Sequence, residues 1–238
     1  MRGWNSFGVG YFNKKRIIAG YQWSDSVVYK QDITALIPTD EKEIWIGVYI
    51  GNYDKGGHKV SLELDFYPEA EQPAYKKDII PLFNTVNILE AAGQNYGRLF
   101  DGDSLNMVFE TKDSIADLQM LFTTSGHGGW ENGDEFNPKL NQVFIDGIEV
   151  FKITPWRTDC GTYRLHNPSS GNFPDGLSSS DFSRSNWCPG ALTPPYLVPL
   201  KNLKAGKHTL KIAIDQGKNE GNSFSHWCVS GVLIGHEK

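Results

Sequence analysis

The sequence predicts an all-β protein built as a sandwich or jelly roll. Apolar and polar residues alternate with a period of two in several segments, as half-buried antiparallel strands require. Glycine occurs 25 times and proline 12 times in 238 residues, so the predicted strands are short and separated by turns. No segment shows the apolar period of a long helix.

The predicted strands follow one another along most of the chain. In residues 58–66, the side chains of Val60, Leu62, Leu64 and Phe66 would share one face. Residues 207–214 repeat this pattern. The other predicted strands cover residues 43–50, 78–84, 105–111, 116–123, 195–200 and 224–234.

The strongest local signal is a hairpin in residues 141–151. The pair Asp146-Gly147 separates two apolar runs. Glycine adopts the positive φ that a two-residue primed turn demands, so this pair predicts a tight connection between two antiparallel strands.

A linker is predicted at residues 67–74, where prolines and glutamates follow a predicted strand. It divides the chain into residues 1–74 and residues 75–238. The part before the linker is short for a free-standing sandwich, so it should lean on the second part or be incomplete. Residues 154–195 show little strand character, and an irregular stretch of this length is usually functional when it is ordered.

Charge and hydropathy exclude several classes of protein. The formal net charge is −5, which argues against a nucleic-acid partner because such proteins present a basic face. No run approaches the roughly 20 apolar residues of a membrane span, and the first residues lack the apolar block of a signal peptide. An apolar content of 39% excludes wholesale disorder.

The three cysteines favour one disulfide. Cys160 and Cys188 lie in loop-like segments, whereas Cys228 lies in a predicted strand. A Cys160–Cys188 bridge with one buried thiol is therefore the economical assignment, and it would place the protein in an oxidising compartment, secreted or periplasmic. Three reduced thiols are the alternative. No spacing of cysteines or histidines indicates a metal site, so we expect none.

A glycine-rich segment after the predicted strand 116–123 is the first candidate for chemistry. It contains His127, Trp130 and Glu135. A carboxylate near aromatic rings is partly desolvated, which raises its pKa toward the range useful for proton transfer. His127 and Trp130 could stack on a sugar or a peptide. The alternative is a plain turn with a solvated glutamate.

The second candidate lies in the long irregular stretch. It contains Arg157, Arg184 and Trp187 together with the two paired cysteines. Arginine forks suit polar ligands such as glycans. In the alternative interpretation, Arg184 only bonds loop carbonyls and Trp187 only fills the core.

These motifs together resemble bacterial peptide-N-glycosidase F, a family that hydrolyses the amide joining an N-glycan to asparagine. The resemblance rests on Gly-His-Gly, Asp-Glu-Phe, Trp-Arg-x-x-Cys, Asn-Pro and Arg-x-x-Trp-Cys-Pro-Gly, in this order between residues 78 and 200. It implies two adjacent antiparallel jelly rolls, with the site in the cleft between them and the first jelly roll incomplete here. It also implies no cofactor, and N-glycosylated peptides or glycoproteins as partners of a monomer.

The resemblance assigns roles to individual residues. Glu135 matches the family's second-domain glutamate, Arg184 the arginine that helps to hold the substrate, and Trp187 the neighbouring tryptophan. Cys160 and Cys188 match a family disulfide. The family's short cystine around the glutamate is absent, since Gly133 and Asn137 occupy its places.

The family's principal catalytic aspartate follows a tryptophan, and the matching place here is Trp4-Asn5. Asn5 lacks the ionisable group of a general base. Three hypotheses stand: a glycopeptide amidase, a glycan- or glycopeptide-binding module that does not cleave and, because the part before the linker is short, a structural part of a larger secreted protein. Asp25 or Asp54 would be the substitute base.

Overall fold

The structure is a computed structural model, and it describes residues 26–38, 43–48, 59–68, 77–85, 100, 103–128, 133–166, 181–217 and 225–237. Within these ranges lie two short 3-10 helices and eight strands. In chain order they are η1 (Thr34–Leu36), β1 (Lys77–Asn84), β2 (Ser104–Thr111), β3 (Ile115–His127), β4 (Asn141–Ile145), β5 (Ile148–Ile153), η3 (Cys160–His166), β6 (Tyr196–Pro199), β7 (Gly206–Ile214) and β8 (His226–Glu237). None of the described helices is long and apolar enough to cross a membrane.

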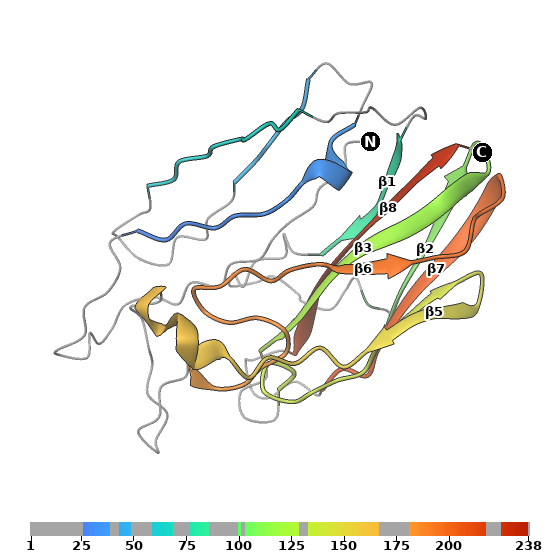
Figure 1. The fold of residues 1–238 in the computed structure, drawn as a ribbon. Coiled ribbons are helices and arrows are strands. Elements are labelled where there is room, and N and C mark those ends of the chain that lie inside the picture. The colour runs from blue at the N-terminus through green and yellow to red at the C-terminus, as the bar shows by residue number, and fades with distance from the viewer. Residues whose placement is uncertain are drawn as a thin grey trace.

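The strands form two four-stranded sheets that face each other, as Figure 1 shows. The first has the order β1-β8-β3-β6 and the second the order β2-β7-β4-β5. Every paired strand runs antiparallel to its neighbour. The predicted all-β sandwich class is confirmed.

The core lies between the two sheets, and the period-two pattern of the strands fills it. In β7, the alternate residues Leu210, Ile212 and Ile214 are at most 1% exposed. They pack with the inward residues of β3, of which Met120 and Phe122 are fully buried. The apolar face predicted for residues 207–214 is therefore the core face of its sheet.

The predicted hairpin is present between β4 and β5. Asp146 has a φ of 50° and Gly147 a φ of 77°, the two positive values that a primed turn requires. The carboxylate of Asp146 also accepts hydrogen bonds from the backbone N–H of Thr209 at 2.8 Å and from the ring of His208 at 2.7 Å. The turn is thereby fixed to β7.

The pair His208–Asp146 should make stability depend on pH. Burial lowers the pKa of His208, but hydrogen bonds to Asp146 and to the Lys204 carbonyl outweigh it and raise the pKa above 6.5. The imidazolium therefore stabilises the fold at pH values below 6.5, and this contribution is lost as pH rises through the raised pKa. Urea unfolding at several pH values should show this loss, and His208→Gln should remove it. An identical pH slope in both proteins would contradict the assignment.

The predicted strands at 43–50 and 58–66 are wrong for the residues that can be compared. Residues 43–48 and 59–68 are described and form no strand. Their apolar side chains face solvent, with Leu62 58% and Phe66 76% exposed. Alternation alone does not make a strand, because the segment also needs a neighbouring backbone to accept and donate its hydrogen bonds.

Hydrogen bonds join residues 26–38 to the second part of the chain. The Tyr29 hydroxyl donates to the Gly190 carbonyl at 3.1 Å, and the Lys77 ammonium donates to the Thr34 carbonyl at 3.0 Å. The boundary predicted between residues 74 and 75 lies outside the described residues, so the division of the chain there stays a prediction.

The predicted disulfide is confirmed. Cys160 and Cys188 are bonded across 28 residues, both fully buried, and Cys228 is free. The Cys228 thiol is enclosed although the residue as a whole is partly exposed, and burial raises its pKa to about 12.

Reducing the disulfide should lower the free energy of unfolding by roughly 3–4 kcal/mol, because the bridge limits the entropy of the unfolded chain. Denaturation with and without a reductant measures this difference. The double variant Cys160→Ala/Cys188→Ala should match the reduced protein, while Cys228→Ala should keep the full effect of reduction. An unchanged unfolding midpoint on reduction would contradict the prediction.

Candidate active site

The site begins where β3 ends. Asn141 of the second sheet accepts a hydrogen bond from Thr124 at 2.6 Å, which fixes this end of β3 in the sandwich. Two residues later, the backbone of Gly126 packs closely against neighbouring segments of the chain. Its N–H donates to the Ser185 carbonyl at 3.1 Å, and its carbonyl accepts from the Trp187 indole at 3.0 Å. Gly126 thereby joins β3 to the loop that carries the predicted arginine.

Gly126→Ala should damage both stability and activity. A Cβ at this position would lie 2.8 Å from the Asp134 carbonyl, from the Ser185 Cβ and from the Trp227 ring. None of these atoms can move without shifting backbone or a core ring, so we expect about 1–3 kcal/mol of destabilisation. Thermal unfolding measures it. Gly161→Ala is the control because its nearest atoms are 3.6 Å away. Equal midpoints for the two variants would contradict the expectation.

An ion pair between Glu135 and Arg184 forms the centre of the site. The Arg184 Nη1 donates to the Glu135 Oε1 at 2.8 Å. The arginine side chain is 1% exposed, whereas that of the glutamate is 14% exposed. The other carboxylate oxygen of Glu135 accepts from the Gly128 backbone N–H at 3.4 Å. The pair therefore reaches solvent through the carboxylate and not through the cation.

Two aromatic rings enclose the guanidinium of Arg184. Its central carbon lies 5.0 Å from the Phe136 ring centroid and 4.7 Å from that of Trp187, both within cation–π range. Burial lowers the pKa of Arg184, and the negative charge of Glu135 opposes this shift. The side chain remains a cation because an ordinary arginine pKa lies far above neutral pH.

Backbone hydrogen bonds hold the loop 184–187 in place. Arg184 forms a two-way bridge with Arg157, at 2.9 and 3.0 Å, and the Ser185 N–H donates to the Glu135 carbonyl at 2.9 Å. Asn186 has a φ of 64°, a conformation that asparagine tolerates better than most residues. Its amide donates to the Thr124 carbonyl at 2.8 Å. The chain can therefore turn sharply beside Arg184.

His127 lies against this cluster. Its ring is 4.9 Å from the Trp187 ring and stacks on His226 at 5.2 Å. One ring nitrogen is 2.8 Å from the Ser125 hydroxyl. Burial, followed by the charges of His226 and Arg184, lowers the pKa of His127 well below its usual value, so the imidazole is neutral at neutral pH.

The side chain of Arg157 is engaged elsewhere. It forms a fork with Asp159, at 2.9 and 2.6 Å, and also donates to the Tyr163 hydroxyl and to the Leu192 carbonyl. Its backbone reaches the site while its guanidinium braces the disulfide loop. A role for Arg157 in substrate binding stays a prediction.

The structure brings Glu135, Arg184, Trp187 and His127 together from three separate segments of the chain. Asn5 and Trp130 lie outside the described residues. Among the described residues, one group of potential metal ligands occurs, comprising Asp159, Cys160 and Cys188. Because the two cysteines are bonded to each other, they offer no thiolate to an ion.

Asp134 and His226 also belong to the candidate site, although the sequence did not single them out. Asp134 is fully buried directly before Glu135, and His226 stacks on His127 across the β3–β8 ladder. An acidic residue inside a glycine-rich turn gave a weak signal for Asp134, whereas nothing local pointed to His226.

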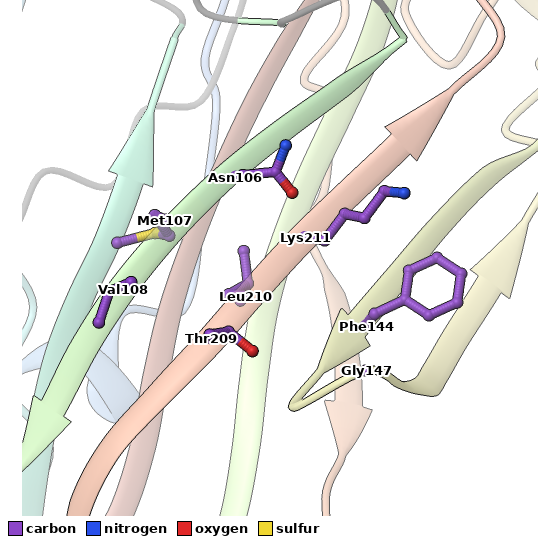
Figure 2. A pocket seen from close by; sticks show the side chains of 8 residues that line it. All are labelled: Asn106, Met107, Val108, Phe144, Gly147, Thr209, Leu210 and Lys211. Atoms are coloured by element: carbon purple, nitrogen blue, oxygen red, sulfur yellow. The ribbon is translucent and has the colours of Figure 1, made fainter.

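A shallow depression of about 510 Å³ lies on the second sheet, apart from these residues (Figure 2). Its lining comprises Asn106, Met107, Val108, Phe144, Gly147, Thr209, Leu210 and Lys211. Neither Glu135 nor Arg184 belongs to it. The chemistry of the ion pair, and not the size of this depression, marks the candidate site. That Glu135 lines a cleft between the two parts of the chain stays a prediction.

Two family models match this chain. The model of peptide-N-glycosidase F, C terminal, matches residues 95–234, and that of peptide-N-glycosidase F, N terminal, matches residues 1–66. The chain belongs to the peptide-N-glycosidase F family. All the described members of the site lie within the stretch matched by the C-terminal model. Among curated proteins, none matches the sequence.

Solved structures of PNGF-II resemble this member of the peptide-N-glycosidase F family. The structure in the C2 space group is 53% identical, with a TM-score of 0.63. The match covers 68% of this chain and 30% of the PNGF-II chain. The structure in the P21 space group is 51% identical with a TM-score of 0.64, and it covers 70% and 31%. A recombinant peptide:N-glycanase F (PNGase F) is 19% identical with a TM-score of 0.48, covering 69% and 53%. The chain thus spans less than a third of the length of PNGF-II.

Proposed function

We propose that this chain is a glycopeptide amidase that hydrolyses the bond between the asparagine side chain and an N-glycan. The observation that carries the proposal is the Glu135–Arg184 pair, in which a partly exposed carboxylate is held by a buried cation between two aromatic rings. Membership of the peptide-N-glycosidase F family supports the substrate class.

In the proposed reaction, water attacks the carbonyl carbon of the asparagine side chain. The carbon–nitrogen bond breaks, the nitrogen takes a proton and leaves on the sugar, and aspartate remains in the peptide. Glu135 would assist by orienting the water or by helping to move a proton to the leaving nitrogen. Arg184 and Trp187 are 1% and 4% exposed, so they would hold the sugar end of the substrate indirectly, by fixing the Glu135 carboxylate, with His127, Trp130 and Arg157 as further contacts.

The second candidate is a module that binds glycopeptides without cleaving them. Asn5, which follows Trp4, favours it, because the sequence resemblance predicts that this position corresponds to the family's principal catalytic aspartate. An amide cannot accept a proton from water as a carboxylate does. The same binding surface around Glu135 would then serve recognition alone.

The third candidate is a structural part of a larger secreted protein. Exposed apolar side chains in 43–48 and 59–68 favour it, since such side chains mark contact surfaces. Trp45 is 77% exposed and Phe66 76% exposed. The disulfide supports a secreted or periplasmic location, because such bonds persist in oxidising compartments. A monomer in size-exclusion chromatography would fit the first two candidates, and self-association would favour the third.

Conversion of glycosylated asparagine to aspartate, read by peptide mass, tests the proposal. The unmodified chain should convert a denatured N-glycoprotein slowly, and Glu135→Gln should abolish the conversion. Glu149→Gln is the matched control, because Glu149 lies on β5 and pairs with Lys152. Glycopeptide binding without conversion would establish the second candidate, and neither binding nor conversion would contradict both.

A further inference from the structure

Asp134, the residue before Glu135, has a fully buried carboxylate with fixed partners. One oxygen accepts from the Trp227 indole at 2.8 Å, and the other accepts from the Gly217 backbone N–H at 2.8 Å. The Lys139 ammonium lies 3.9 Å from the second oxygen. These partners come from the start of β8, from the chain after β7 and from the chain before β4, so one side chain joins three segments.

The backbone of Asp134 makes two more contacts. Its N–H donates to the Ser225 hydroxyl at 3.2 Å, and its carbonyl accepts from the Ser185 hydroxyl at 2.5 Å. Ser185 directly follows Arg184. Asp134 is therefore bound on one side to the sheet and on the other to the loop that carries the cation of the site.

The carboxylate depends on these partners, because burial by itself disfavours its charged form. Burial raises the pKa of Asp134, while hydrogen bonds from Trp227 and Gly217 partly offset the shift. An ionised group held in such a place costs free energy relative to an apolar core. Both of its main donors are N–H groups, which a carboxylate accepts with its two oxygens. An asparagine at this position would turn its own N–H₂ group toward one of these two donors, and that hydrogen bond would be lost.

We propose that Asp134 is a positioning residue that sets Glu135 at its distance from Arg184. This inference rests on the proposed function, since it gives the residue a purpose in the reaction at Glu135. Asp134 touches no reacting atom. It acts by fixing the turn that carries Glu135 to β8 and to Ser185.

The variant Asp134→Asn tests this proposal. We expect kcat for glycopeptide hydrolysis to fall by about 10²-fold, because a displacement of about 1 Å at a reacting group has an effect of this size. KM should change by much less, because Asp134 is fully buried and makes no contact with the substrate. Asp146→Asn is the matched control, in which another hydrogen-bonded carboxylate is neutralised at the far hairpin, and its kcat should equal that of the unmodified chain.

Two further variants keep the test decisive if Asp134→Asn does not fold. Ser225→Ala removes the acceptor of the Asp134 N–H, and Trp227→Phe removes one donor to the carboxylate. Each of these variants should lower kcat by a larger factor than it changes KM. The double variant Asp134→Asn/Trp227→Phe should have a kcat only slightly lower than that of the more damaging single variant, because both substitutions remove the same contact.

A crystal structure of Asp134→Asn separates this proposal from the proposed function. If the unmodified chain hydrolyses no glycopeptide, the proposed function fails, and the structure still decides the role of Asp134. A Glu135–Arg184 contact longer than hydrogen-bond distance would support positioning. An unchanged contact of 2.8 Å, or an unchanged kcat in an active chain, would overturn it.

Discussion

Asn5→Asp should increase the rate of glycopeptide hydrolysis by about 10²–10⁴-fold, the usual contribution of a general base. The substitution supplies an ionisable carboxylate at the place where the sequence resemblance predicts the family's catalytic aspartate. Glu135 and Arg184 already form the ion pair of the candidate site. Initial rates of glycan release from a denatured glycoprotein, compared at equal enzyme concentration, measure the effect.

The matched control for this gain is Asn13→Asp, which adds the same carboxylate eight residues further along. It should leave the rate unchanged. If the unmodified chain already hydrolyses glycopeptides rapidly and Asn5→Asp adds nothing, the match of Trp4-Asn5 to the family motif is wrong. The base would then be sought at Asp25 or Asp54.

Arg184→Ala should lower the free energy of unfolding by about 3–5 kcal/mol, in addition to weakening the binding of substrate. Removing one partner of a buried ion pair leaves the other charge without compensation. The substitution also empties the space between Phe136 and Trp187, because the arginine is 1% exposed. Urea denaturation measures the loss.

Two comparisons isolate the cause of the stability loss in Arg184→Ala. Arg184→Ala combined with Glu135→Gln should recover part of the stability, because a neutral amide replaces the uncompensated carboxylate. Arg164→Ala removes another arginine that pairs with an aspartate, Asp181, but that partner is 39% exposed, so the loss should be at most about 1 kcal/mol. Equal losses for Arg164→Ala and Arg184→Ala would contradict a special role of the buried cation.

Local signals predicted the parts of the fold that depend on neighbouring residues. The turn at Asp146-Gly147 was predictable because its two positive φ values suit these residue types. The core face of residues 207–214 was predictable because alternation survives in a paired strand. The strand predicted at 59–66 is wrong for a physical reason. A strand forms only when it pairs with a partner strand, and the sequence of the segment does not specify that partner.

The candidate site was only partly predictable for the same reason. Glu135, Arg184 and Trp187 carry recognisable motifs, and the structure brings them together. The donors to the Asp134 carboxylate lie far away in sequence, Gly217 at a separation of 83 residues and Trp227 at a separation of 93. Arg157 illustrates the opposite case, because its guanidinium bonds Asp159 two residues later, and its type alone suggested a ligand contact.

The most direct test of the central claim is hydrolysis in water enriched in heavy oxygen, followed by mass analysis of peptide and glycan. The claim is that the chain cleaves the asparagine amide with help from Glu135. We expect the label to enter the new aspartate carboxylate, Asn5→Asp to accelerate this incorporation, and Glu135→Gln to prevent it. Label found in the sugar with a sugar left on asparagine, or incorporation at an undiminished rate in Glu135→Gln, would contradict it.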